Sequence, residues 1–403
     1  MIASQSLRHT TQARPVGPQE EDSGARIRLT DHAAGEGPLH DAPEIVDALI
    51  AQTFELGASD LHLLPTRDGL RVCWRIDGVL HHAGDLPAAV APNVVTRLKV
   101  LADLLTYESQ NPQEGRLKST ALENPVRIST FPTVYGEKVV ARVLQAGAAE
   151  LGRLSDLQLP AEAQQVLSHA FRQTSGAILI VGPAGSGKTT TAYAIIREIV
   201  AQTGGARSIA TLEDPVEVVL EGVTQSQAAP HAGFDLQSGL RALVRQDPEV
   251  ILVGEIRDAE TARLAYQAAL TGQLVVTTFH ASDVATAVSR LLDMDLPPYV
   301  LRGATRAIAA QRLVRSLCEC SQAAQPQGCP ACRQTGYRGR RVLAEAVDFT
   351  QPAVSQLLAE QLDRQQLQEK LLAGGLIGLR QQAERLVSQG ETSLLEIERV
   401  LGC

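Results

Sequence analysis

Short apolar runs recur along the second half of the chain, each followed by a segment with the spacing of an amphipathic helix. The runs cover residues 177–181, 208–212, 250–254 and 274–278. Runs of this length predict buried strands, and strands that alternate with helices are typical of a mostly parallel sheet with helices on its faces. The pattern therefore predicts an α/β domain, which we expect to span residues 161–403.

A different pattern occupies residues 41–147, where apolar and polar positions alternate in several short stretches. An amphipathic helix begins in residues 42–50. The alternation indicates half-buried strands; it covers residues 60–64, 70–76, 126–130 and 138–143. We predict a small α+β domain here, joined to the α/β domain by a linker over residues 148–160.

The two ends of the chain lack this strand pattern. Residues 1–40 are rich in Gln, Gly, Ala, Pro and charged residues without a sustained period, which predicts a disordered tail. Residues 297–403 have mainly helical periodicity, interrupted by a cysteine-rich segment. We therefore expect the last hundred residues to be mainly helical.

The composition narrows the class of protein. The chain has 403 residues, of which 44% are hydrophobic and 20% charged, and its net charge is −8. A dedicated nucleic-acid binder usually has a basic surplus, so no nucleic-acid partner is expected. No apolar run approaches the roughly 20 residues that cross a bilayer, and the N-terminus lacks an apolar secretory segment. We expect no transmembrane segment and a cytoplasmic location.

The strongest candidate for chemistry follows the run at 177–181. Residues 182–189 fit G-x-x-x-x-G-K-[ST], and a helix is predicted directly after them. Such a loop turns backbone N–H groups toward a phosphate at the positive end of a helix dipole. Lys188 is expected to reach the β- and γ-phosphates of a nucleotide and Thr189 to bind Mg²⁺. The predicted nucleotide-binding residues are Gly182, Pro183, Ala184, Gly185, Ser186, Gly187, Lys188, Thr189 and Thr190.

Polar residues follow the other predicted strands of the same sheet. Glu255 ends the run at 250–254, in the manner of a Walker B carboxylate that holds Mg²⁺ through water or orients the attacking water. Glu213 and Glu217 follow the run at 208–212, and His280 follows the run at 274–278. Three acids in residues 213–217 are costly to gather unless a cation compensates, although an acidic solvated turn would also explain them. His280 is expected to sense the γ-phosphate, the alternative being a structural histidine.

Four cysteines lie close together in the interruption of the C-terminal region. They are Cys318, Cys320, Cys329 and Cys332. In a reducing compartment such clustering indicates metal, and four thiolates suit tetrahedral Zn²⁺. Four unbound reduced thiols are the alternative. Cys73 and Cys403 are expected to lie outside this site.

These motifs together resemble the secretion ATPase family that powers type II secretion and type IV pilus machines. In the predicted second domain the similar stretches are EDPVE at 213–217, LVRQDPE at 243–249, VGEIRD at 253–258 and His280. In the predicted first domain they are GASDLH at 57–62, RIDGV at 75–79, PQEGR at 112–116 and GEKVV at 136–140. The resemblance covers roughly residues 41–403.

The resemblance implies a PAS-like domain joined to a RecA-like ATPase domain, assembled as a homo-hexameric ring. The ring would work with inner-membrane platform proteins and lie peripherally at that membrane. The family's first-domain arginines fall on Arg127 and Arg142, which would clamp the γ-phosphate. Surface ion pairs would also explain these two arginines.

The chain departs from the family pattern at three places. The first cysteine pair is C-x-C rather than C-x-x-C, and the histidine segment reads TFHAS at 278–282. The further N-terminal domain typical of assembly members is not expected in residues 1–40. The cysteines favour the secretion or extension branch over a pilus-retraction motor. Two further hypotheses stay open at this point, a RecA-like nucleic-acid motor and a nucleotide-binding scaffold without turnover.

Overall fold

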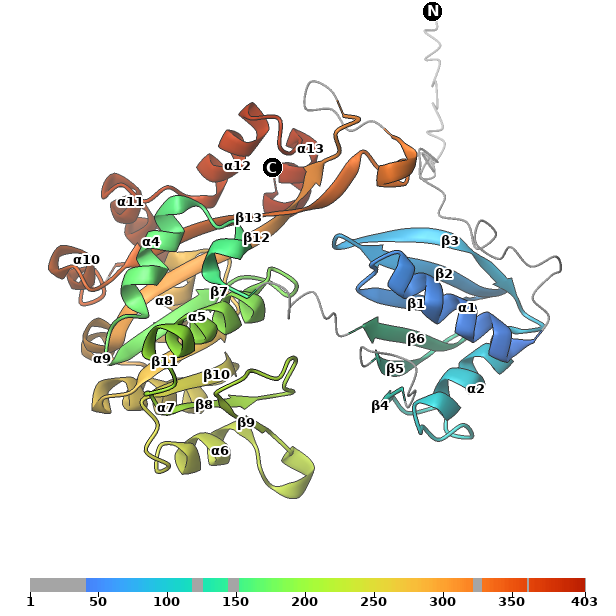
Figure 1. Ribbon diagram of the computed structural model, residues 1–403, viewed down its shortest axis with the longest axis horizontal. Coiled ribbons are helices and arrows are strands. Elements are labelled where there is room, and N and C mark those ends of the chain that lie inside the picture. Colours follow the sequence, from blue (N-terminus) through green and yellow to red (C-terminus); the bar gives the residue numbers. More distant parts are fainter. Residues whose placement is uncertain (1–40, 118–125, 144–151, 322–327, 361, 403) are drawn as a thin grey trace, which may run out of the picture.

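The computed structural model describes residues 41–117, 126–143, 152–321, 328–360 and 362–402 (Figure 1). The predicted tail over residues 1–40 lies outside this part of the chain. Two domains lie side by side, each with its own sheet (Figure 1). The second domain is the predicted α/β domain, so the predicted fold class is confirmed.

The first domain has a six-stranded antiparallel sheet in the order β3-β2-β1-β6-β5-β4. Two helices, α1 (Ala42–Glu55) and α2 (Ala91–Leu101), pack their apolar residues against it around the fully buried Trp74. All four predicted strands are present here. The strands are β1 (Asp60–Thr66), β2 (Gly69–Ile76), β3 (Val79–Pro87), β4 (Gln113–Arg116), β5 (Val126–Thr133) and β6 (Gly136–Val143).

The second domain has a seven-stranded sheet in the order β13-β12-β7-β11-β10-β8-β9. All neighbours are parallel except β13, which runs antiparallel to β12. The strands are β7 (Gly176–Val181), β8 (Ile209–Glu213), β9 (Thr224–Gln227), β10 (Val250–Ile256), β11 (Leu274–Phe279), β12 (Thr305–Leu317) and β13 (Tyr337–Asp348). The four strands predicted from apolar runs are β7, β8, β10 and β11. Every residue of β7 and β11 is buried because hydrophobic cores cover both faces of the sheet.

Helices on the two faces form those cores. On one face lie α4 (Ala161–Ala170) and α5 (Lys188–Thr203), and the opposite core includes residues of α6 (Leu236–Leu243), α7 (Ala259–Thr271), α8 (Val284–Asp293) and α9 (Pro298–Ala304). The remaining helices follow β13; they are α10 (Pro352–Gln356), α11 (Arg364–Ala373), α12 (Leu379–Ser388) and α13 (Leu394–Leu401). In the described ranges, none of the helices combines the length and apolar character needed to cross a bilayer.

The expectation that residues 297–403 are mainly helical is wrong for two long segments. Strands β12 and β13 have 13 and 12 residues and extend the sheet beyond β7. The sequence of β12 is rich in Ala and Arg, which are good helix formers. Pairing with β7 on one side and β13 on the other overrides that local preference.

Part of the predicted linker packs onto the second domain. The short 3₁₀ helix η1 (Leu154–Leu157) places Leu154 and Leu157 in the same core as β7 and α5, and Leu159 joins them. The described residues of the segment therefore belong structurally to the second domain.

Candidate active site

The loop over residues 182–187 connects the buried strand β7 to the N-terminus of α5. Gly185 and Gly187 have φ angles of 73° and 87°, a left-handed conformation that favours glycine. At Gly182 an added Cβ would lie 2.4 Å from the Ser186 Oγ and 2.6 Å from the Gln311 carbonyl oxygen. The loop therefore requires glycine, and the 16-residue helix after it directs its positive end at the same place.

The side chains of the loop fit a phosphate. Lys188 is only 8% exposed, and its Nζ donates to the Pro183 carbonyl at 2.9 Å, so the ammonium group folds back over the loop. Burial lowers the pKa of Lys188, an effect that the charge of Glu255 opposes. The buried Oγ of Ser186 has no hydrogen-bond partner among the described residues. An anionic phosphate would accept hydrogen bonds from both the Ser186 hydroxyl and the Lys188 ammonium group.

Glu255 and His280 come together at the carboxyl ends of neighbouring strands. The Nε2 of His280 lies 3.3 Å from the Oε2 of Glu255. Arg257 also pairs with Glu255 and reaches Asp214 at 3.2 Å. The Thr278 hydroxyl donates to the Gly254 carbonyl at 2.7 Å, which ties β11 to β10 beside this pair. The structure thus gathers the predicted Walker B carboxylate and the predicted histidine at one edge of the sheet.

The two other predicted carboxylates occupy different positions. Glu213 is 2% exposed and accepts hydrogen bonds from Thr211 at 2.5 Å, from Gln225 at 3.2 Å and from the Tyr193 hydroxyl. Its oxygens are therefore engaged within the domain.

Glu217 instead lies beside Thr189 of the phosphate loop, and the Thr189 side chain favours the charged form of this carboxylate. The pKa of Glu217 is raised, first because neighbouring atoms partly shield its carboxylate from water and second because Glu213 has the same charge. The residue nevertheless keeps an exposed surface. Of the two carboxylates, Glu217 is therefore the one next to the predicted magnesium ligand.

Gln311 supports the phosphate loop, and the sequence reasoning missed it. Its Nε2 donates to the Ser186 carbonyl at 2.8 Å, and it is almost fully buried on β12. No local signal identifies it, because the periodicity of residues 297–403 predicts helices. Its contribution depends on β12 pairing beside β7.

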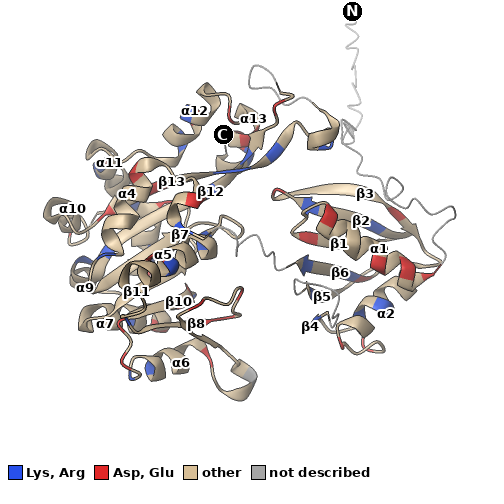
Figure 2. Ribbon diagram, viewed as in Figure 1, with Lys and Arg blue, Asp and Glu red and all other residues tan. Residues whose placement is uncertain are grey.

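The two predicted arginines lie opposite one another on adjacent strands of the first domain, Arg127 on β5 and Arg142 on β6. Figure 2 shows basic residues on this part of the sheet. The Nε of Arg142 lies 2.7 Å from the Oδ1 of Asp60, and Arg127 pairs with Glu114. The charge of Arg142 also acts on Glu217 in the second domain, where it opposes the rise of that pKa. Arg142 therefore lies within electrostatic reach of Glu217.

The four predicted cysteines form one cluster. Their Sγ atoms all lie within 4.8 Å of one another, with Cys318 to Cys329 at 3.9 Å and Cys320 to Cys332 at 3.7 Å. A tetrahedral zinc with Zn–S bonds of about 2.3 Å has sulfur–sulfur edges of about 3.8 Å. The thiol set fits zinc despite the C-x-C spacing.

The backbone around Cys332 also favours a thiolate. Its Sγ accepts hydrogen bonds from the N–H groups of Cys329 at 3.2 Å and Gly336 at 3.3 Å. Burial opposes ionisation of this thiol, but the N–H donors outweigh it and lower the pKa of Cys332 to about 6. Cys73 lies on β2, away from the cluster, and Cys403 lies outside the described residues.

The tip of the first domain contacts the segment that follows the cysteine cluster. Asp77, at the β2–β3 turn, accepts a hydrogen bond from the Gly339 N–H at 3.1 Å and pairs with Arg340 at 3.6 Å. Both partners lie on β13, a few residues beyond Cys332. The cysteine cluster and the first domain are thus neighbours.

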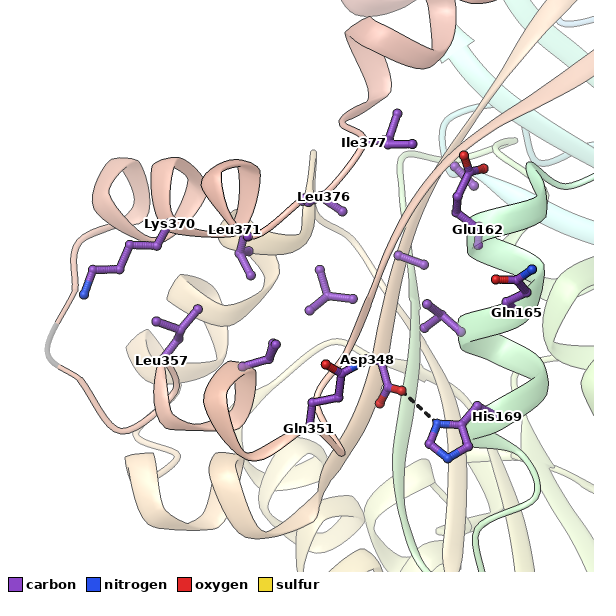
Figure 3. Close-up of a pocket in the computed structure, with 18 of the residues that line it drawn as sticks. Glu162, Gln165, His169, Asp348, Gln351, Leu357, Lys370, Leu371, Leu376 and Ile377 are labelled. Carbon is purple, nitrogen blue, oxygen red and sulfur yellow. Dashed lines mark hydrogen bonds and ion pairs between the residues drawn. The ribbon is translucent and has the colours of Figure 1, made fainter.

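A separate cavity of about 450 Å³ lies among α4, β13, α10 and α11 (Figure 3). A contact of 2.7 Å between the His169 Nδ1 and the Asp348 Oδ2 lies on its wall (Figure 3). Its described lining residues include none from the phosphate loop or the cysteine cluster. The predicted nucleotide site therefore lies at the phosphate loop and the strand ends, and not in this cavity.

Comparisons with known proteins agree with this geometry. Residues 33–399 match the family described as type II/IV secretion system protein. The type II secretion system protein HxcR of Pseudomonas aeruginosa is 39% identical over 363 residues, which are 88% of this chain and 76% of that protein. The type IV pilus assembly ATPase PilB of the same species is 36% identical over 408 residues, which are 94% of this chain and 71% of PilB.

Among solved structures, the pilus retraction motor PilT with bound ADP has a TM-score of 0.63 and 26% identity, covering 87% of this chain and 95% of that one. This neighbour has the same parallel-sheet ATPase fold, whereas the sequence relatives with higher identity are named for secretion and pilus assembly. The chain therefore belongs to the type II/IV secretion system protein family and is an ATPase of the type II secretion and type IV pilus assembly kind.

Proposed function

We propose that ATP is hydrolysed at the phosphate loop, with Glu255 acting on the attacking water. The observation that carries this proposal is the convergence of Lys188, Glu255 and His280 at one edge of the sheet. A carboxylate beside a phosphate loop can orient water or hold a metal ion. Glu255 has the position for this role because part of its side chain is exposed near the end of β10, whereas Glu213 is almost fully buried.

Each remaining residue of the site has a proposed part. Lys188 would neutralise charge at the β- and γ-phosphates, and the Thr189 hydroxyl would hold Mg²⁺ with Glu217 beside it. Bound Mg²⁺ supplies charge stabilisation to the transferred phosphoryl group. His280, through its pair with Glu255, would respond when the γ-phosphate leaves.

We further propose that the first domain completes the site. Arg142, and with it Arg127, would approach the γ-phosphate when the domains close, which stabilises charge that develops in the transition state. Hydrolysis would then be linked to movement between the domains. In a homo-hexameric ring on the cytoplasmic side of the inner membrane, that movement would act on platform proteins of a secretion or pilus machine.

We propose a structural zinc at the cysteine cluster. Its four thiols are close enough to share one ion, and their loop lies against the first domain through Asp77. A closed four-thiolate site leaves no open position for catalysis. The metal would therefore order this loop rather than take part in hydrolysis.

The second candidate function is pilus retraction, which the fold match to PilT favours. The higher identity to assembly and secretion proteins and the cysteine cluster favour the extension branch. A nucleic-acid motor is disfavoured by the net charge of −8.

The test uses the purified full-length chain. Phosphate release from Mg-ATP and molecular mass by light scattering are measured with and without single-stranded DNA. Hydrolysis by a hexamer, unchanged by DNA, is expected. Hydrolysis that requires DNA would favour the nucleic-acid motor, and the absence of hydrolysis under both conditions would contradict the assignment of the site.

A further inference from the structure

One row of charged residues crosses the sheet of the first domain. Asp60 on β1 lies opposite Arg75 on β2 and opposite Arg142 on β6. Arg142 lies opposite Arg127 on β5, which in turn lies opposite Arg116 on β4. Residues opposite one another on neighbouring strands project from the same face. We call this set, Arg75, Asp60, Arg142, Arg127 and Arg116, the arginine row.

The row gathers like charges that destabilise one another when they lie directly opposite. Asp60 is the acid that stands in register with them, and it is only 3% exposed. Its Oδ1 lies 2.7 Å from the Arg142 Nε, and its Oδ2 lies 3.6 Å from the Arg75 Nε. A carboxylate buried in this way is costly unless cations and hydrogen bonds compensate it. Both oxygens of Asp60 therefore have a defined cationic neighbour.

Asp60 is itself held in place. The Ser59 hydroxyl donates to its Oδ2 at 2.8 Å, and the surrounding sheet excludes water from it. Because Arg75 and Ser59 hold its carboxylate inside the sheet, Asp60 can serve as an anchor for a longer and more exposed side chain.

Arg142 is that exposed side chain. Its side chain is 64% exposed although its Nε is bound to Asp60. A guanidinium group has further donors on its two terminal nitrogens, and a contact through Nε leaves them available. The charge of Arg142 also favours the ionised form of Glu217, the carboxylate beside Thr189 of the phosphate loop. Arg142 is thus bound at its Nε by a buried carboxylate, while most of its side chain stays exposed.

We propose that Asp60 is the positioning residue of Arg142: it holds the Nε so that the terminal nitrogens point at the phosphate. This inference rests on the proposed function, in which Arg142 stabilises charge during hydrolysis. A flexible arginine loses rotamer freedom when it binds, and a donor fixed beforehand is more effective at a developing charge. Asp60 acts through Arg142 and does not touch the nucleotide.

A merely structural role for Asp60 makes a different prediction. If the Asp60 contacts only hold β1 to β2 and β6, their loss lowers the thermal stability of the chain and leaves kcat unchanged. If Asp60 positions Arg142, its loss affects kcat only while Arg142 is present. A double-mutant cycle separates the two roles.

The test measures kcat and KM for Mg-ATP in the full-length chain. Asp60→Asn keeps the shape of the side chain and removes its charge, so kcat should fall roughly 10-fold with KM changed less than about 2-fold, since misplacement of a transition-state group affects mainly kcat. In the Arg142→Ala background the same change should have no further effect. Asp85→Asn is the matched control, because Asp85 also lies opposite an arginine, Arg71, on the same sheet.

A second variant keeps Asp60 intact and therefore avoids any folding defect at that buried position. Arg142→Lys retains the charge but has no Nε donor, so its single nitrogen reaches either Asp60 or the phosphate. It should reproduce the roughly 10-fold fall in kcat. Thermal unfolding is recorded for each variant.

The outcomes separate the two claims. Equal kcat values for Arg142→Lys and the parent chain, or a loss from Asp60→Asn that persists in full without Arg142, would overturn the positioning role while the clamp role of Arg142 stands. An Arg142→Ala variant with the kcat of the parent chain would remove the clamp role itself, and the positioning role with it.

Discussion

The phosphate loop and the arginine row differ in how each would bring positive charge to the proposed nucleotide site. The loop uses glycines, backbone N–H groups and a lysine that is almost fully buried and already folded over it. The row uses arginine side chains of the first domain, among them the exposed Arg142, which is anchored by a buried aspartate. The loop is complete within its own domain, whereas the row depends on how the domains are placed.

This difference indicates separate contributions to binding and to turnover. A preformed backbone cradle interacts with a phosphate in the ground state and in the transition state alike, so it supports binding as well as reaction. An arginine that arrives from another domain can act selectively when charge is redistributed, which changes mainly kcat. Variants of the two regions can therefore separate effects on nucleotide binding from effects on turnover.

The largest effect is expected for Lys188→Ala. It removes the buried cation of the loop, so phosphate release should fall below about 1% of the parent value and nucleotide binding should weaken. Steady-state phosphate release and binding of a fluorescent ATP analogue measure the two effects. Lys370→Ala is the control, since this lysine pairs with Glu360 away from the loop. Turnover near the parent value in Lys188→Ala would remove the loop from the mechanism.

Glu255→Gln should reduce turnover while nucleotide binding persists. The amide keeps the size of the side chain but cannot act as a base, so hydrolysis should fall by at least ~100-fold. Single-turnover hydrolysis and analogue binding are measured on the same preparation. Glu260→Gln is the matched control, because Glu260 pairs with Arg241 and Arg263 on the helical surface. If the Glu255 variant keeps its turnover, Glu217 becomes the candidate for the water-orienting role.

Arg142→Ala should have an intermediate effect that appears in kcat. The loss of one charged donor to a developing charge should lower kcat about 10- to 100-fold, with affinity changed far less. Arg71→Ala, on the same sheet and paired with Asp85, is the control. A loss confined to KM would assign Arg142 to ground-state binding and would remove the contrast between the two regions.

Removal of metal from the cysteine cluster should affect hydrolysis least. The parent chain is expected to contain about one Zn²⁺, because four thiolates close a structural site. Chelation, or Cys329→Ser, should expose residues 328–337 to proteolysis because metal binding and local folding are coupled. Elemental analysis and peptide mapping are the measurements, with Cys73→Ala as control. Metal-free protein with an unchanged proteolysis pattern would contradict the structural role.

The local parts of this protein follow from the sequence. The apolar runs predict β7, β8, β10 and β11 because strands of a parallel sheet are buried on both faces. The phosphate loop can also be predicted from the sequence, because it depends on a short segment. That segment contains the strand, the helix and the glycines that its backbone requires, Gly185 and Gly187. The cysteine spacing likewise predicts a cluster that the fold forms.

Tertiary structure decided what depends on residues distant in the chain. Strands β12 and β13 have helix-favouring or charged sequences, and only their pairing beside β7 makes them strands and brings Gln311 to the loop. Glu213 and Glu217 look alike in sequence, yet Tyr193 and Thr211 donate hydrogen bonds to the first, whereas the second lies beside Thr189. The alignment of Asp60 with Arg75 and Arg142 arises from strand register. Local propensity and motif spacing report on neighbours in sequence, whereas register and burial depend on contacts between segments that the folded chain alone brings together.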